Sequence, residues 1–252
     1  MNQVPSIVPL SSILKYHQQS SFFISTKWES FNFHFGGIQS NAVTELFGPS
    51  GTGKTQFCIQ IALLSAHYGH IVVVVDALSC WTSERITSMY TALFPSVSLT
   101  SPEFKSTLAR IRIFQPCSSD ISFYFSLFGW FFRILRYFSS LPLDLLPSVF
   151  LVDSISSILL PLITSQSPSL LFSASHTVTL LRNLAEKSRI VLTTNTCTHN
   201  QSNLIASLGS IWRPSIRILL LRHGEYNICA VDHDSLVKQE VEGRLNDQGI
   251  TD

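Results

Sequence analysis

The sequence predicts an α/β fold with a doubly wound, mostly parallel sheet that closes in a C-terminal antiparallel hairpin. Apolar strand-like runs alternate with helix-like segments along most of the 252 residues, a pattern typical of parallel sheets covered by helices. Residues 70–77 form a continuous β-branched run, as expected of a central strand buried on both faces. Two further apolar runs, 215–223 and 226–233, are separated by Gly224 and Glu225, which predicts the hairpin.

The individual elements follow from apolar spacing and from residues that end helices or begin turns. Residues 54–69 carry apolar side chains at helical spacing and end at Gly69, a common helix stop. Residues 95–107 predict a loop, and the Ser- and Thr-rich residues 164–179 predict a mobile connection. In chain order, we expect strands at 42–47, 70–77, 110–116, 148–154 and 189–195, and helices at 54–69, 83–94, 120–139 and 176–188.

The chain is expected to hold one domain after a short extension. Residues 1–30 are polar, aromatic and irregular, with Pro5 and Pro9, and predict an N-terminal arm with one short helix near residues 13–18. Residues 31–252 contain the alternating elements and suit one α/β core. Charged residues make up 13% of the chain, against about a quarter in most soluble proteins. Much of the chain should therefore be buried, in its own core or against a partner.

The net charge and the cysteines indicate which partners and which cellular compartment suit the chain. A net charge of +1 gives the whole chain little electrostatic steering toward a phosphate backbone. The odd number of cysteines, without a C-x-x-C pair or a paired histidine cluster, favours reduced thiols in an intracellular protein over a disulfide framework or a zinc site. The N-terminus also lacks the basic start and long apolar run of a signal peptide.

One segment, residues 121–135 (ISFYFSLFGWFFRIL), is apolar enough to raise the question of a membrane span. It has 15 residues and is followed by Arg136, whereas a spanning helix needs about 20 apolar residues. We therefore expect no membrane contact and a buried or partner-facing helix. Its aromatic residues exceed what one helix face can bury, so core packing and a protein interface both stay open for Phe123, Phe125, Phe128, Trp130, Phe131 and Phe132.

A glycine-rich turn between the first expected strand and helix carries the clearest chemistry. It fits G-x-x-x-x-G-K-[ST] in full, a loop whose backbone N–H groups point at phosphate oxygens while the following helix adds its positive N-terminal end. Lys54 would place a positive charge near the β- and γ-phosphates, and the Thr55 hydroxyl would bind Mg²⁺. The predicted nucleotide-binding residues are Gly48, Pro49, Ser50, Gly51, Thr52, Gly53, Lys54 and Thr55.

A second metal-side residue is expected at the end of another buried strand. Phosphate-loop proteins hold Mg²⁺ partly through an acidic residue at such a strand end. The run VFLVDS places Asp153 there. We therefore predict that Thr55 and Asp153 hold Mg²⁺ beside ATP, with Asp153 acting through a water molecule.

The ordered set of motifs resembles the RecA-type recombinase family and, within it, the eukaryotic recombinase paralogues. The resemblance is collinear from Gly36 to Asp252 and implies a RecA-like P-loop ATPase core. The phosphate loop alone is common to many ATPases, so the order of the whole set makes the resemblance specific. The segments that carry it are GGIQSNAVTELFGPSGTGKTQ, VVVVDALSCWTSERI, VFLVDSISSIL, IVLTTN and SLGSIWRPSIRILLLRHGEYNICAVDHD.

Two departures from the family pattern concern hydrolysis. The family places a Glu two residues beyond the Asp that ends its second strand, where the Glu polarises the attacking water; here Asp76 is followed at that position by Leu78. The family also places a Gln after the Thr-Asn of the TTN strand, where it senses the γ-phosphate; here the residue is Thr196. The resemblance therefore implies ATP binding with weak or absent hydrolysis.

The segments that match the family's DNA-binding loops lack the expected basic residues. The first falls near residues 161–175 and contains no Lys or Arg. The second falls near residues 196–212 and holds His199 as its one candidate cation up to Trp212. Because strand-exchange proteins need basic loops against the phosphate backbone, we expect DNA contact to be weak or indirect.

The resemblance thus favours an ATP-binding, non-catalytic paralogue in a heteromeric complex that assists the main recombinase in homologous recombination repair. It implies other recombinase paralogues as partners and a nuclear location. By analogy with the short paralogues of mediator complexes, it also implies a SWIM-type zinc protein as a partner. One alternative is an active DNA-dependent ATPase in which Glu84 or Asp120 replaces the missing carboxylate. A second alternative is a P-loop regulator unrelated to DNA.

Overall fold

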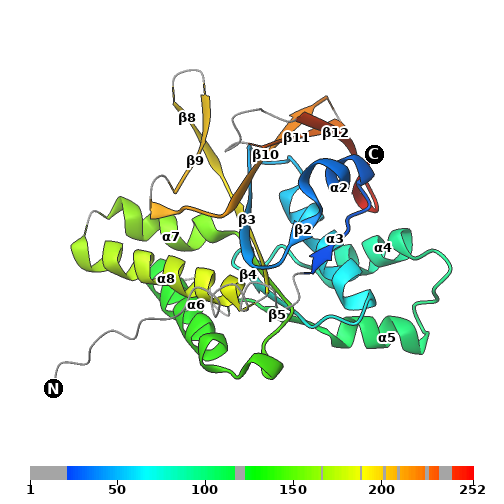
Figure 1. Ribbon diagram of the computed structural model, residues 1–252, viewed down its shortest axis with the longest axis horizontal. Coiled ribbons are helices and arrows are strands. Elements are labelled where there is room, and N and C mark those ends of the chain that lie inside the picture. The colour runs from blue at the N-terminus through cyan, green and yellow to red at the C-terminus, as the bar shows by residue number, and fades with distance from the viewer. Residues whose placement is uncertain are drawn as a thin grey trace, which may run out of the picture.

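A single large sheet organises the molecule, and its elements are drawn in Figure 1. The computed structural model describes residues 22–116, 123–165, 167–187, 189–200, 203–208, 211–224, 227–232 and 240–252. Within these residues, nine strands pair in the order β13-β12-β11-β10-β3-β7-β6-β4-β5. The strands are β3 (Ala42–Phe47), β4 (Val72–Asp76), β5 (Ile111–Phe114), β6 (Val149–Asp153), β7 (Ile190–Asn195), β10 (Ile216–His223), β11 (Asn227–Asp232), β12 (Glu240–Asn246) and β13 (Gly249–Thr251).

The type of strand pairing changes once across the sheet. From β10 to β5 all neighbours are parallel, while β11, β12 and β13 continue the β10 edge in antiparallel pairs. Strand β3 lies between β7 and β10, with Phe47 opposite Asn195 on one side and opposite Leu219 on the other. Because these strands are parallel, their carboxyl ends share one edge of the sheet, where ligands bind in open α/β folds.

Helices cover both faces of the sheet. One face is covered by α2 (Glu29–Phe35), α3 (Lys54–His67), α4 (Ser83–Leu93) and α5 (Pro102–Ala109), and the other by α6 (Phe123–Ser140), α7 (Ile155–Thr164) and α8 (Pro168–Glu186). Successive strand residues point to opposite faces. In β4, for example, Val72 and Val74 join the first core while Val73 and Val75 join the second. These two buried cores confirm the expected doubly wound α/β architecture with an antiparallel C-terminal edge.

The expected strands and helices are present, and two connections differ from expectation. Within residues 95–107, where we expected a loop, α5 begins at Pro102, and the Ser101 hydroxyl accepts a hydrogen bond from Phe104 N at 3.1 Å. Residues 164–179 are mostly helical, because α8 begins at Pro168 rather than at His176. In both helices a Ser precedes a Pro at the first helical position. This Ser-Pro pair in the sequence indicates the start of a helix.

The segments expected to be DNA loops have regular structure. Residues 161–175 contain the end of α7 and the start of α8. Within residues 196–212, β8 (Cys197–Asn200) and β9 (Asn203–Ala206) form a separate antiparallel pair. Beyond the expected hairpin, β12 and β13 extend the sheet by two more strands. A 3₁₀ turn, η1 (Leu143–Leu145), leads into β6.

The N-terminal segment is part of the fold from residue 22 onward, which corrects the expectation of an irregular arm up to residue 30. Strand β1 (Phe23–Ile24) pairs with β2 (Ile38–Gln39). Trp28 is fully buried, and its indole Nε1 donates a hydrogen bond to Glu242 O at 2.8 Å. A Cβ atom on Gly243 would lie 2.5 Å from the Trp28 ring, so glycine is required where β12 crosses it. The short helix expected near residues 13–18 lies outside the described residues.

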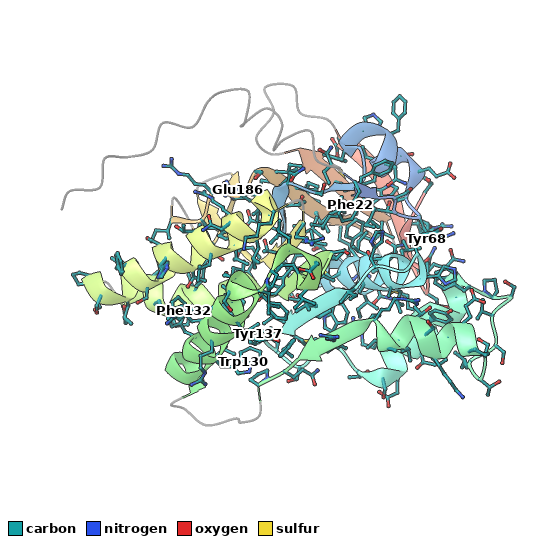
Figure 2. All side chains as sticks on the ribbon, turned by 60° about the horizontal axis from the view of Figure 1, so that its bottom comes forward. Phe22, Tyr68, Trp130, Phe132, Tyr137 and Glu186 are labelled. Atoms are coloured by element: carbon teal, nitrogen blue, oxygen red, sulfur yellow. The ribbon has the colours of Figure 1, made fainter. Side chains whose placement is uncertain are left out.

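Helix α6 packs several of its aromatic side chains inside the domain, which confirms the core-packing alternative for those residues. Phe131 is fully buried in the second core, and Phe128 and Trp130 pack partly against that core. The Phe132 ring meets His176 of α8 edge to face at 5.4 Å, whereas Tyr137 is exposed (Figure 2). The side chains of Phe123 and Phe125 lie outside the described residues. Among the helices described, none is long and apolar enough to cross a membrane.

Replacement of Trp28 tests whether the N-terminal segment stabilises the domain. We expect Trp28→Ala to lower the free energy of unfolding by about 3–5 kcal/mol, because it leaves a large cavity under β12. Chemical denaturation measures this change. Phe33 on the same short helix is 86% exposed, so Phe33→Ala should change stability by less than about 0.5 kcal/mol. Equal effects of the two variants would contradict the packing of Trp28.

Candidate functional site

A cleft of about 620 Å³ lies at the carboxyl edge of the sheet. The turn between β3 and α3 forms its floor, and the ends of β6 and β7, the loop after β4, and the turn of the β12–β13 hairpin form its walls. The residues that line it are Ser50, Gly51, Thr52, Gly53, Lys54, Thr55, Gln56, Leu78, Cys80, Arg85, Asp153, Ser154, Thr194, Thr196, Arg222, Leu245, Asn246 and Asp247.

The predicted phosphate loop lies in the expected context of strand, turn and helix. Gly51 and Gly53 have φ angles of 80° and 85°, a left-handed conformation that only glycine adopts without strain. At Gly48 a Cβ atom would lie 2.2 Å from Leu220 O, so the loop can leave β3 beside β10 only with glycine there. At Gly51, by contrast, the one neighbour within 4 Å is Arg222 Nη1 at 3.7 Å. The turn therefore forms an open, glycine-lined cradle that fits a phosphate group.

Lys54 is the first residue of α3 and folds back over the loop. Its Nζ donates hydrogen bonds to Gly48 O at 2.9 Å and to Pro49 O at 2.7 Å. Burial lowers the pKa of Lys54, while the nearby Cys197, Asp153 and Cys58 act in the opposite direction. A positive charge and the N-terminal end of a 14-residue helix thus meet at the same turn. This combination suits a phosphate anion.

Asp153 stands at the end of β6, where the sequence placed it, and faces the cleft. One carboxylate oxygen accepts a hydrogen bond from Trp81 Nε1 at 3.1 Å, and the other accepts one from the Thr194 hydroxyl at 2.5 Å. The peptide bond between Asp153 and Ser154 is cis. Because Thr55 lines the same cleft, hydroxyl and carboxylate oxygens come together as a donor set that suits Mg²⁺.

Asp76, at the end of β4, has a structural role. Its Oδ1 accepts a hydrogen bond from Cys80 N at 3.0 Å, and its Oδ2 accepts one from Trp81 N at 2.8 Å and another from Gln115 Nε2 at 2.8 Å. The carboxylate is fully buried and fixes the loop that follows β4. Leu78 projects from that loop into the cleft with 59% of its surface exposed. An apolar side chain therefore occupies this wall of the cleft.

Known proteins that resemble the chain are concerned with DNA repair, although no family model matches it. The chain is 24% identical over 210 residues to DNA repair protein RAD51 homolog 2 of Homo sapiens, covering 78% of this chain and 52% of that protein. It is 25% identical over 224 residues to DNA repair and recombination protein RadB of Thermoplasma volcanium, covering 86% of each. DNA repair protein RAD51 homolog 4 of Bos taurus is 28% identical over 195 residues, covering 73% and 56%.

These matches span most of the chain, 78%, 86% and 73% of its residues. They support the resemblance of the chain to RecA-type recombinase paralogues. It spans about half the length of the RAD51 homologues that it matches. The fold described above is consistent with the core of RecA-type recombinases.

A chain of polar contacts runs from the cleft into the centre of this RecA-type sheet. The Thr196 hydroxyl, in the cleft, lies 2.9 Å from the Ser207 hydroxyl, which donates to Asn195 Oδ1 at 2.7 Å. Asn195 Nδ2 in turn donates to Glu45 Oε1 at 2.7 Å, and Arg217 Nε donates to Glu45 Oε2 at 2.7 Å. The threonine that replaces the family's glutamine is therefore connected to a buried ion pair between β3 and β10.

The structure adds cleft residues that the sequence reasoning missed. Arg222, near the end of β10, donates from Nη1 to Gly51 O at 3.2 Å and so contacts the phosphate loop. Arg85 of α4 donates to Cys80 O at 2.8 Å and reaches Gln56 at 3.2 Å. Asp247, in the turn between β12 and β13, lines the cleft and adds a second carboxylate to that of Asp153. The Arg-His pair at the end of the 215–223 run was one available signal, whereas the position of Asp247 depends on distant contacts.

Of the two residues considered as replacement carboxylates, Glu84 does not line the cleft. Glu84 lies at the start of α4 and is exposed; its carboxylate accepts a hydrogen bond from the Ser83 hydroxyl at 3.0 Å. Its own backbone N–H and the Ser83 and Thr82 side chains lower the pKa of Glu84. These contacts give Glu84 a role at the helix start. Asp120 lies outside the described residues.

The pH dependence of stability should report on Glu45. Burial raises the pKa of Glu45 above its ordinary value of 4.5, although Asn195 and Arg217 oppose the shift. The folded chain therefore holds this proton more tightly than the unfolded chain does. As pH rises above 4.5, the wild type should lose stability relative to Glu45→Gln. The difference between their free energies of unfolding should fall by at most about 1.4 kcal/mol per pH unit.

Chemical denaturation at a series of pH values measures this difference. Glutamine is the matched replacement because it keeps the size of the side chain and can still accept from Arg217. A difference that instead grows with pH would show that the ion pair with Arg217 outweighs the cost of burying the Glu45 charge.

Proposed function

We propose that the chain binds ATP with Mg²⁺ and acts as a non-catalytic subunit in a complex that assists the main recombinase in homologous recombination repair. The observation that carries the proposal is the pairing of a complete phosphate cradle with an exposed Leu78 at the position of the family's water-polarising Glu. The relatives named as DNA repair proteins supply the biological setting. Binding and hydrolysis are separable because different residues serve them.

The binding part of the proposal rests on the loop and on the donors around it. Gly48, Pro49, Ser50, Gly51, Thr52 and Gly53 would surround the phosphates with backbone N–H groups, and Lys54 would place its ammonium beside them. Thr55 would bind Mg²⁺ directly, and Asp153 would hold it through water. Asp153 is kept in place for this by Trp81 and Thr194.

The expectation of slow or absent hydrolysis rests on the same cleft. Asp76 already accepts three hydrogen bonds that hold the loop from Ala77 to Trp81. Leu78 can neither accept a proton nor orient water. Thr196 has a shorter side chain than the family's glutamine, and its hydroxyl contacts Ser207.

Weak or indirect DNA contact is proposed from the sequence of the two segments that match the family's DNA loops. Residues 161–175 contain no Lys or Arg and are mostly helical, and residues 196–212 include the β8–β9 pair. A binding groove for single-stranded DNA combines basic residues with aromatic stacking platforms. Neither segment supplies the basic part of this combination.

The proposed partners are other recombinase paralogues and, by analogy, a SWIM-type zinc protein, in the nucleus. Several large apolar side chains stay exposed on the described surface, and they are available to such partners. They include Phe23, Phe33, Tyr68, Tyr137 and Phe172. Bound ATP would stabilise the folded chain by mass action and, through the loop, the β10 edge that contacts it.

A second candidate function is active, DNA-dependent ATP hydrolysis. Asp247 favours it, because it supplies a second carboxylate to the lining of the cleft. The β12–β13 turn that carries it is held on α3 by hydrogen bonds from Gln60 Nε2 to Gln248 O at 2.9 Å and to Ile250 O at 3.0 Å. ATP turnover distinguishes the two functions.

We expect the purified chain to bind ATP–Mg²⁺ without appreciable turnover, with or without single-stranded DNA. At an ATP concentration 100-fold above Kd, binding should stabilise the fold by about 2.7 kcal/mol and raise Tm by roughly 5–10 °C. Lys54→Ala should abolish this shift. Lys105→Ala, an exposed lysine on α5, is the matched control and should preserve it.

Thermal unfolding and phosphate release measure the two properties. Robust hydrolysis that DNA stimulates and that Lys54→Ala removes would establish the second candidate function instead. Its further loss in Asp247→Asn would identify the carboxylate responsible. Absence of any ATP-dependent shift in the wild type would contradict nucleotide binding itself.

Affinity purification from cells tests the proposed complex. Tagged wild type should co-purify with other recombinase paralogues, and Lys54→Ala should recover less of them if ATP stabilises the surface that they contact. Mass spectrometry identifies the proteins, and Lys105→Ala again serves as the control. Specific partners that include no recombination protein would favour a P-loop regulator unrelated to DNA.

A further inference from the structure

Three metal-ligating side chains converge on one face of the antiparallel edge, outside the nucleotide cleft. His223 ends β10, Cys229 lies on β11 and Glu240 begins β12, and their ligand atoms all lie within 4.8 Å of one another. The pairing register places all three on one face of the sheet, with His223 and Glu240 on opposite sides of Cys229 along the strands. Leu221 is opposite Cys229, and His223 is two residues beyond Leu221, while Val231, two residues beyond Cys229, is opposite Glu240. Steps of two keep side chains on the same face of a sheet.

The contacts within this trio already bring a sulfur and a carboxylate together. Cys229 Sγ donates to Glu240 Oε1 at 2.9 Å, and the Cys229 side chain is fully buried. Burial and the Glu240 carboxylate raise the pKa of Cys229 to about 12, and Glu242, directly opposite Cys229 on β12, acts in the same direction. The site therefore gathers acidic groups around a thiol, with His223 exposed at its rim.

We propose that His223, Cys229 and Glu240 form a binding site for Zn²⁺. The ion would take the place of the proton that Cys229 shares with Glu240, and coordination would release that proton to solvent. Thiolate, imidazole and carboxylate are all ligands that Zn²⁺ accepts, whereas Mg²⁺ prefers oxygen alone. Three protein ligands leave the fourth position of a tetrahedral site for water or another donor.

The geometry requires only a small closure of the side chains. Ligand atoms around tetrahedral Zn²⁺ lie roughly 3.3–3.6 Å apart, from bond lengths of about 2.0–2.3 Å. The trio is within 4.8 Å before any ion is considered, and the sulfur and the carboxylate oxygen are already closer than that. His223 and Glu240 lie at the end of one strand and the start of another, where side-chain rotation is least restricted by packing.

This site lies next to the nucleotide cleft but uses different residues. His223 follows Arg222, whose guanidinium contacts the phosphate loop at Gly51. Zn²⁺ would cross-link β10, β11 and β12. Strand β10 carries Arg222, and β12 leads into the turn that holds Asp247. The spacing of cysteines along the sequence could not reveal the site, because each ligand comes from a different strand and only one of them is a cysteine.

Metal titration of the full chain, stripped with a chelator, tests the proposal. We expect one equivalent of Zn²⁺ to bind and to raise Tm. Co²⁺ should bind in its place and give a sulfur-to-cobalt charge-transfer band that a site without thiolate cannot give. Cys229→Ser should abolish the band, and His223→Ala and Glu240→Gln should each weaken Zn²⁺ binding by at least about tenfold.

Matched controls separate this site from other thiols and histidines. Cys197→Ser and His34→Ala, which remove a thiol and an exposed imidazole elsewhere, should leave the cobalt spectrum and the Zn²⁺ affinity unchanged. His223→Ala alters an exposed side chain, so it keeps the test valid if Cys229→Ser fails to fold. Absence of a charge-transfer band in the wild type, or Zn²⁺ affinity unaffected by His223→Ala and Glu240→Gln, would overturn the proposal.

Discussion

The buried carboxylate of Glu45 constrains the centre of the sheet more than any other single group described here. Glu45 lies in the middle of β3 and is fully buried. One of its oxygens is held by Asn195 of β7 and the other by Arg217 of β10. A buried charge is tolerated only when its partners are in place. The three strands that deliver the phosphate loop, Thr196 and Arg222 to the cleft are therefore fixed in one relative position by one side chain.

The same cleft shows how a nucleotide site can keep its shape while its chemistry changes. The shape depends on glycine conformations, on the helix start at Lys54 and on carboxylates that hold neighbouring loops. Asp76 illustrates this separation of shape from chemistry. It holds the loop that follows β4, while the side chain that lines the cleft there is Leu78. Substitution at Leu78 leaves that framework intact because its exposed side chain projects into the cleft, and substitution at Thr196 removes one hydroxyl contact with Ser207. Loss of hydrolysis would thus require no change in the fold.

The sequence predicted the parts of the fold and of the cleft that depend on local pattern. The continuous apolar runs of β3, β4, β6 and β7, and the spacing of the phosphate loop and Asp153, are all local signals. The start of α5 at Ser101-Pro102 was local as well but was outweighed by the surrounding turn residues. The positions of Trp28 and Asp247 could not be predicted, because each is set by contacts with segments far away in the chain.

The side chain of Asp252 accepts hydrogen bonds from the backbone N–H groups of Glu29 and Ser30, at 2.6 and 2.8 Å, and so caps the first turn of α2. Burial alone would raise the pKa of this carboxyl, but the hydrogen bonds from Ser30 and Glu29 lower it. Residues more than 200 positions apart thus share one helix start. A proteolytic clip that removed only the last few residues would therefore leave the first turn of α2, next to the buried Trp28, without its cap.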